Sequence, residues 1–271
     1  MNIMGTSLDP LLFWKADGSP RKALNFATST LAAFVRGGAG AFVGRLGPRP
    51  ERRLVLYEME SCPHSRKVRE ALSMLDLDAD IRPCPRGGRV HRQELERAVH
   101  VDAKVPVLID PNTGDVLTES DAIVQHLFRQ YGDGPVPALL RRNPLADLTS
   151  MAASSLRGHA AMHAAPAKRP ELPLHLYSYE ASPYCRVVRE VLGRLEIPYI
   201  VENRARNSPR REAFVAEAGK LQFPYLVDPN TGTRLFESDA IVSYLETTYG
   251  AAAEERAEPA ARPSPVEAAA E

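Results

Sequence analysis

Two short segments of the chain place a nucleophilic side chain at the expected start of a helix. Cys62 precedes Pro63 in the first segment, and Ser182 precedes Pro183 in the second. Because proline is tolerated at the first helical position, each nucleophile is expected at a helix N-terminus. The unpaired N–H groups and the positive end of the helix dipole favour the thiolate, which is the reactive form of cysteine. Cys62 is therefore a candidate nucleophile, and an unreactive capping cysteine is the alternative.

The surroundings of the two nucleophile positions differ. His64, Arg66 and Lys67 follow Cys62 and could add positive charge beside its thiol. Ser65 stands where a Cys-x-x-Cys motif would have its second thiol. Ser182 is a residue type that caps helices well. Cys185 follows three residues later and is expected to be a small, buried, apolar side chain.

Cys84 is the third and last cysteine, and it ends the second predicted strand. If the first two strands are parallel, their carboxyl ends share one edge of the sheet, so Cys84 could resolve an oxidised Cys62. A structural thiol is the alternative. Three cysteines form no disulfide framework and match no metal-ligand spacing, so the sequence predicts no metal site and a reducing, cytoplasmic setting.

The two nucleophile segments belong to a long internal repeat. Residues 54–77 and 174–197 are identical at 11 of 24 positions, and residues 104–132 and 222–250 at 17 of 29. A repeat this long indicates a duplicated domain, because solenoid units run only ~20–50 residues. A fainter match upstream pairs Ser29–Ala33 with Thr149–Ala153, which suggests a short helix before each domain.

Each copy is predicted to be an α/β unit of order β-α-β-α-β-β-α. Val68, Leu72 and Leu75 recur at helical spacing and mark the inward face of the first helix. A strand, a helix and a second strand in succession imply parallel pairing with a right-handed crossover. In the first copy the expected strands span residues 53–58, 80–83, 105–109 and 116–117, and the later helices span residues 91–100 and 119–130.

Composition and repeat boundaries divide the 271 residues. The expected order is an N-terminal segment with a short helix over 1–52, a first domain over 53–132, a linker with a helix over 133–172, a second domain over 173–250 and a disordered tail over 251–271. Lys+Arg and Asp+Glu both number 34, so bulk charge predicts no nucleic-acid partner.

Two apolar segments, residues 24–43 and 145–156, stand outside the repeat cores. A membrane span needs ~20 apolar residues with few charges, and Arg36 interrupts the first segment, so a membrane span is not expected. No secretory signal is evident. Packing on the domains, oligomer formation and contact with a membrane surface are all open for these segments.

The order of these features resembles the glutaredoxin-like N-terminal domain of glutathione S-transferases. The shared features are the nucleophile position after the first strand, an X-Pro pair before the third strand (Val105-Pro106 and Phe223-Pro224) and a Glu-Ser pair opening the last helix (Glu119-Ser120 and Glu237-Ser238). The resemblance implies two tandem thioredoxin-like domains with helical flanking segments. Neither copy is followed by the helical C-terminal domain of such transferases, so a conjugating activity is disfavoured.

The resemblance implies glutathione as ligand or co-substrate. Cys62 would form a mixed disulfide with it, and Ser182 would either donate a hydrogen bond to its sulfur or only cap a helix. Val105 and Phe223 would pair with its cysteinyl part, each before a cis proline, Pro106 or Pro224. The Glu-Ser pairs would hold its γ-glutamyl end, with an acidic first helical turn as the alternative.

The implied function is a glutathione-dependent thiol-disulfide oxidoreductase or thiol transferase that uses Cys62 on protein thiols or disulfides. A non-catalytic glutathione-binding adaptor is the alternative.

Overall fold

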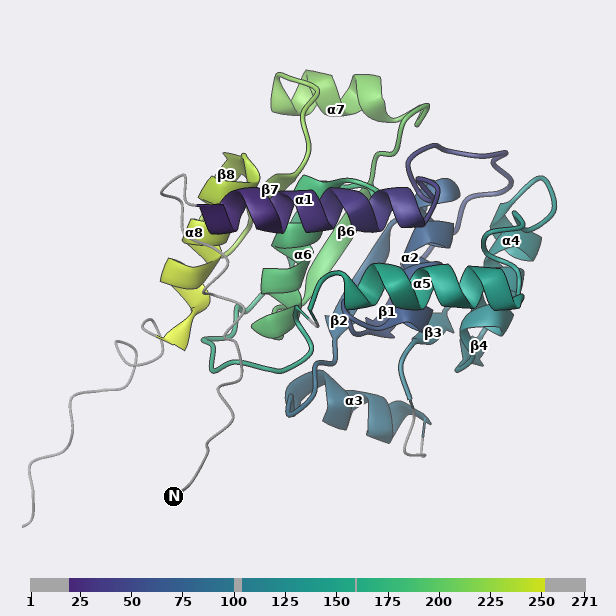
Figure 1. Cartoon of the computed structure of the whole chain (residues 1–271), viewed down its shortest axis with the longest axis horizontal. Coiled ribbons are helices and arrows are strands. Elements are labelled where there is room, and N and C mark those ends of the chain that lie inside the picture. Colours follow the sequence, from purple (N-terminus) through teal and green to yellow (C-terminus); the bar gives the residue numbers. More distant parts are fainter. Residues whose placement is uncertain (1–19, 100–103, 159, 252–271) are drawn as a thin grey trace, which may run out of the picture.

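The computed structural model describes residues 20–99, 104–158 and 160–251 of the chain (Figure 1). The tail predicted from residue 251 lies outside these residues from residue 252 onward. The first half holds α1 (Pro20–Val35), β1 (Leu54–Glu58), α2 (Pro63–Met74), β2 (Ala79–Pro83), α3 (Val90–Val99), β3 (Val107–Asp110), β4 (Asp115–Leu117) and α4 (Ser120–Tyr131). The second half holds α5 (Pro144–Ser155), β5 (Leu174–Ser178), α6 (Pro183–Arg194), β6 (Tyr199–Asn203), α7 (Arg211–Ala218), β7 (Tyr225–Asp228), β8 (Thr233–Phe236) and α8 (Ser238–Tyr249).

Both copies have the predicted thioredoxin-like topology. In the first, β1 pairs with β2 in parallel and with β3 antiparallel, and β3 and β4 form the expected hairpin. The second copy repeats this arrangement with β5 to β8. This confirms the predicted parallel pairing, since α2 connects two neighbouring strands of the same direction.

The two copies share one continuous sheet of eight strands, in the order β4-β3-β1-β2-β6-β5-β7-β8. They join through an antiparallel pair between β2 and β6, in which Asp80 lies opposite Ile200. Each copy thereby covers the strand that would be an exposed sheet edge in the other. The antiparallel join relates the two domains by an approximate two-fold axis, which the repeat alone did not predict.

One large core runs beneath both halves of the sheet. Leu54 and Leu56 point from β1 into it, and Val68, Leu72 and Leu75 meet them from α2, as their spacing predicted. The opposite face carries two smaller clusters, one under α3 and one under α7, and Tyr57 and Tyr177 begin these from β1 and β5. Alternation along each strand therefore divides the side chains between the two faces.

The flanking helices cross between the domains. α1 precedes the first domain but packs on α6 of the second, and α5 precedes the second domain but packs on α2 of the first. Figure 1 shows α1 and α5 on the same side of the sheet, and the two helices contact each other. The apolar segments at 24–43 and 145–156 therefore pack on the domains. No helix in the described ranges is long and apolar enough to cross a bilayer.

The contacts of these two helices correct the upstream alignment by one residue. The hydroxyl of Ser29 donates to the carbonyl of Pro183 at 3.1 Å, and the hydroxyl of Ser150 donates to the carbonyl of Pro63 at 2.7 Å. The equivalent residue of Ser29 is thus Ser150, and the predicted pairing of Ser29 with Thr149 was wrong. Sequence identity misaligned the two helices because short alanine-rich stretches match in several registers.

Candidate functional site

Cys62 stands at the N-cap of α2, where the sequence placed it. Its φ and ψ of −76° and 124° are extended, and its side chain makes no capping hydrogen bond within the described residues. The Cys62 Sγ atom lies 4.0 Å from the carbonyl oxygen of Val105, and its side chain is 8% exposed. The sulfur therefore lies at a helix N-terminus, beside the loop that precedes Pro106 and with little exposure to solvent.

Cis peptide bonds precede both predicted prolines. They join Val105 to Pro106 and Phe223 to Pro224, which confirms the predicted geometry in each copy. In the first domain the fold brings this loop against Cys62, so three predicted site residues come together. The Ser150 hydroxyl on α5 holds the Pro63 carbonyl, so a helix of the linker supports the same turn.

Ser182 has a different local role. Its side-chain oxygen accepts a hydrogen bond from the backbone N–H of Cys185 at 3.2 Å, and its side chain is buried. This is a helix cap, so the capping interpretation is confirmed. The Ser182 hydroxyl of the second domain therefore caps a helix at the position where the first domain has the Cys62 thiol.

All three cysteines of the described chain are buried and free. Cys84 lies in the apolar cluster of Tyr57, Leu95 and Val107, and burial raises the pKa of its thiol to about 12. Burial also raises the pKa of Cys185, which confirms its prediction as a buried small side chain. These surroundings favour the structural interpretation of Cys84, because a protonated thiol is a poor nucleophile.

The basic residues after Cys62 are engaged elsewhere. Lys67 is buried and pairs with Asp147 at 2.5 Å and with Asp121 at 3.4 Å. Arg66 is buried and faces Glu180 of the second domain at 3.7 Å. Both basic side chains therefore have carboxylate partners in packed interfaces, and their effect on the thiol stays a prediction.

The two Glu-Ser pairs begin α4 and α8 as predicted, but their backbones differ. Glu119 is exposed and has an ordinary φ of −108°, whereas Glu237 has a φ of +68°. A non-glycine residue in this region is uncommon, and such strain is often found at ligand sites. The Glu237 carboxylate accepts a hydrogen bond from the side chain of Gln222, just before the cis-proline loop. Ser120 and Ser238 are both buried at the helix starts.

An aromatic group surrounds the second cis-proline loop and was not predicted. The Phe223 ring lies 4.9 Å from that of Phe214 and 6.2 Å from that of Tyr179, and the Arg211 guanidinium lies 5.4 Å from its centre. The first domain has Val105 at the Phe223 position. The sequence did indicate this aromatic group, because aliphatic residues of the first copy are replaced by aromatic residues at equivalent positions of the second.

The repeated Asp-Pro-Asn-Thr-Gly turns fix the hairpins and the closing helices. The Tyr131 hydroxyl donates to Asp110 Oδ2 at 2.6 Å, and the His126 Nε2 lies 2.8 Å from the same oxygen. Burial alone would raise the pKa of Asp110, but the hydrogen bonds from Tyr131, His126 and Asn112 outweigh it and lower the pKa to about 2. The Tyr249 hydroxyl makes the equivalent bond to Asp228.

Replacing Tyr131 with phenylalanine is expected to destabilise the protein by about 1.5–3 kcal/mol at neutral pH, the range for hydrogen bonds to charged groups. Because the pKa of Asp110 is lower in the folded state than its unfolded value of 3.8, its ionisation stabilises the fold at pH values above 3.8. This stabilisation is lost as the pH falls toward about 2. The penalty of Tyr131→Phe should therefore shrink on acidification. Urea unfolding at pH 7 and at pH 3 measures it, with Tyr249→Phe as the matched variant. An equal penalty at both pH values contradicts the assignment.

Two α/β units with cis-proline loops, one of them facing a helix-capping thiol, define a tandem thioredoxin-like protein. More particularly, the chain belongs to the glutathione S-transferase N-terminal domain family, which matches residues 56–135 and again residues 176–256. Between the two matched segments, the described residues hold one complete helix outside both copies, α5, so no helical C-terminal domain follows the first copy.

Among solved structures, the chain is similar to Leishmania TDR1, described as a unique trimeric glutathione transferase. The identity is 14%, the match covers 72% of this chain and 67% of that chain, and the TM-score is 0.28. No curated protein sequence matches the chain.

Proposed function

We propose that the first domain is a glutathione-dependent thiol-disulfide oxidoreductase or thiol transferase with Cys62 as its nucleophile. The observation that carries the proposal is the Cys62 sulfur, uncapped at the start of α2 and beside the carbonyl before a cis proline. A backbone N–H and C=O at this loop can pair with an extended peptide. The cysteinyl part of glutathione is such a peptide. The membership in a glutathione S-transferase domain family supports the same ligand.

The proposed reaction needs one thiol. The Cys62 thiolate attacks the glutathione sulfur of a mixed disulfide, the substrate S–S bond breaks, and the released substrate thiolate takes up a proton. A second glutathione thiolate then attacks the Cys62–glutathione disulfide, which yields oxidised glutathione and regenerates the Cys62 thiolate. Glutathione is the reductant, so Cys84 is not required, in keeping with its burial. A reducing cytoplasm supplies this reductant.

In this proposal the second domain binds without reacting. Ser182 caps α6, but the second domain retains the cis-proline loop and the strained Glu237, which support ligand binding there. Glu119-Ser120 and Glu237-Ser238 would each hold the γ-glutamyl end of one glutathione. The second candidate function is a glutathione-binding adaptor with no turnover, which the small exposure of Cys62 favours.

Calorimetric titration of glutathione into the whole chain tests the binding. Wild type should bind, Glu119→Ala and Glu237→Ala should each weaken one site about tenfold, which is about 1.4 kcal/mol, and the exposed Glu171→Ala should change nothing. The tenfold loss follows from removing a charged partner of the ligand's ammonium group. Reduction of a glutathione mixed disulfide by wild type is measured alongside. Binding without turnover selects the adaptor function, and failure of both overturns the proposal.

A further inference from the structure

The two helices outside the domain copies run side by side across the junction of the domains. α1 and α5 contact each other on one side of the sheet (Figure 1). Arg36, just after α1, donates to the carbonyl of Ala146 at the start of α5, at 3.0 Å. Arg157, after α5, donates to the carbonyl of Asn25 near the start of α1, at 2.8 Å. The helices are therefore antiparallel, and their contacts obey the approximate two-fold symmetry of the sheet.

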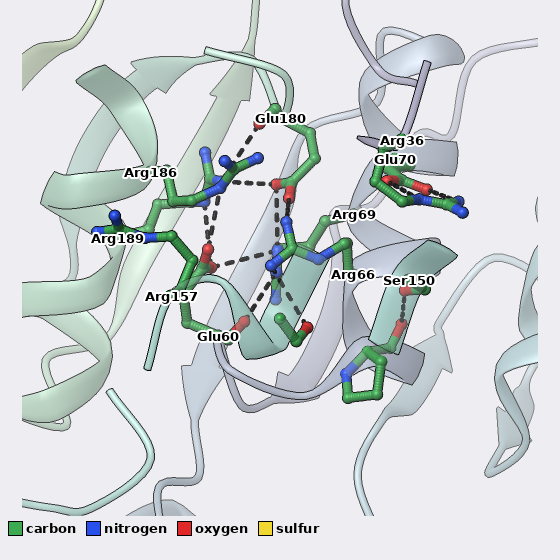
Figure 2. Close-up of polar contacts among 12 residues, drawn as sticks. Arg36, Glu60, Arg66, Arg69, Glu70, Ser150, Arg157, Glu180, Arg186 and Arg189 are labelled. Atoms are coloured by element: carbon green, nitrogen blue, oxygen red, sulfur yellow. Dashed lines mark hydrogen bonds and ion pairs between the residues drawn. The ribbon is translucent and has the colours of Figure 1, made fainter. Parts of the chain in front are cut away.

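Contacts with the domains account for the inner faces of these helices. Figure 2 shows Arg36 paired with Glu70 of α2, and Ser150 of α5, whose hydroxyl donates to the Pro63 carbonyl. On α1, Ser29 and Ala32 are fully buried. The inner residues therefore hold the two helices on α2 and α6.

The outer faces of the two helices are also apolar. We call their exposed large side chains the α1–α5 patch, and each of them is at least 49% exposed: Leu24, Leu31 and Phe34 of α1, and Leu145, Leu148 and Met151 of α5. A helix at a protein surface ordinarily has polar or charged residues on its outer face. Two adjacent helices that both expose apolar side chains instead indicate a contact surface.

The α1–α5 patch has no free charge. From Ala23 to Val35, α1 holds no charged residue, and Asp147 of α5 pairs with Lys67 at 2.5 Å. A neutral patch meets a copy of itself without opposing like charges, and it offers an acidic or basic partner nothing to pair with. The chain has 34 basic and 34 acidic residues, so two copies do not repel each other through their net charge. The charges therefore favour a second copy of this chain as the partner.

The two helices differ from helices that lie on a membrane surface. Such helices carry lysine and arginine along the polar face that borders their apolar face. α1 has its two basic residues in the first turn, and α5 has none. The patch therefore fits a protein surface better than an anionic bilayer.

The size of the patch suits an interface between two copies. At about 1.5 Å per residue α1 is about 24 Å long, and two helices of about 10 Å diameter side by side present a face of about 400–500 Å². Because side chains roughen this face, burying it on both copies removes about 1,000 Å² or more from solvent, which is enough for a specific association.

We propose that the α1–α5 patch is the contact surface of a homodimer, in which the helix pair of one copy packs face to face on that of a second copy. Such a two-fold interface uses the same patch on both copies. Halfway between the two arginine contacts lie Leu31 of α1 and Met151 of α5, which therefore form the centre of the patch. The association does not depend on glutathione or on Cys62.

Sedimentation equilibrium of the whole chain tests the proposal. Wild type should shift from the 29.8 kDa of one chain toward twice this mass as its concentration rises through the micromolar range. Leu31→Glu places two carboxylates at the centre of the contact and should weaken the dimer by more than about 100-fold. Leu148→Glu tests the second helix in the same way. Leu172→Glu, at a similarly exposed leucine outside both helices, is the matched control and should dimerise as wild type does.

The variants should fold normally, because the replaced leucines are exposed. Dilute samples of all three should therefore unfold at the urea midpoint of wild type. The proposal is overturned by a wild type that keeps the mass of one chain at every concentration. It is also overturned by a dimer that persists in both Leu31→Glu and Leu148→Glu.

Two measurements on the whole chain would then identify what the patch contacts instead. Co-sedimentation of a monomeric wild type with vesicles of anionic lipid, lost in Leu31→Glu, would assign the patch to a membrane surface. Trp14, the single tryptophan, lies in the sequence before α1. A shift of its emission to longer wavelength in Leu31→Glu would assign the patch to that segment.

Discussion

Cys62→Ser is expected to lower glutathione-dependent reduction of a mixed disulfide by about 10³-fold or more while glutathione still binds, because loss of a nucleophile removes the covalent step. The hydroxyl cannot form the mixed disulfide with glutathione, yet it fits the same N-cap position and caps a helix well. Ser182 already shows this conformation in the second domain, where φ and ψ are −71° and 121°. The fold should therefore tolerate the change, so that activity and binding can be compared in one variant.

Three control variants distinguish the thiol positions. Cys185→Ala and Ser182→Ala should retain the turnover, because one side chain is buried and the other caps α6. Cys84→Ala should also retain it, since one thiol is enough when glutathione is the reductant. Turnover that persists in Cys62→Ser contradicts the proposed nucleophile, and turnover lost in Cys84→Ala assigns a resolving role to that buried thiol.

Local patterns predicted most of the fold. The apolar spacing on α2 and the prolines that precede the third strand of each copy are short-range patterns. Each of these patterns occurs in both copies of the repeat. The repeat showed which local features are structural, because a proline that precedes a strand by chance would not recur at the equivalent position of the second copy. The divergence of Cys62 and Ser182 likewise stood out only against the otherwise similar copies.

The junction of the domains could not be predicted from those patterns. The strands β2 and β6 pair with each other, but alternation along a strand identifies its faces and not its partner. The charged residues of α2 would ordinarily be interpreted as a solvated helix face, yet Arg66 and Arg69 are buried. The signal was that Glu60, Arg66 and Arg69 persist in the second copy, where the surface residues have changed.

The second large effect concerns Glu180. Glu180→Gln is expected to destabilise the protein by about 3–5 kcal/mol, the usual cost of removing one partner from a buried ion pair. The carboxylate is fully buried and contacts Arg66, Arg69 and Arg189, which lower its pKa to about 2 although burial alone would raise it. Domains of this kind have only about 5–15 kcal/mol of net stability, so the loss is a large fraction of the total.

Urea unfolding of the whole chain measures this loss, with Glu60→Gln as the symmetric variant and the exposed Glu171→Gln as the control. The control should stay within about 0.5 kcal/mol of wild type. A lowered folded-state pKa contributes stability above the unfolded value of 4.5, and this is lost as the pH falls toward about 2. The penalty of Glu180→Gln should thus be full at pH 7 and smaller at pH 3.

Because the buried charges of Glu180 and its arginine partners join the domains, the variant should also unfold over a broader range of urea concentration, as the halves lose their shared contacts. A single transition with an unchanged midpoint would show that the β2–β6 pair and the crossing helices hold the domains together without these charges.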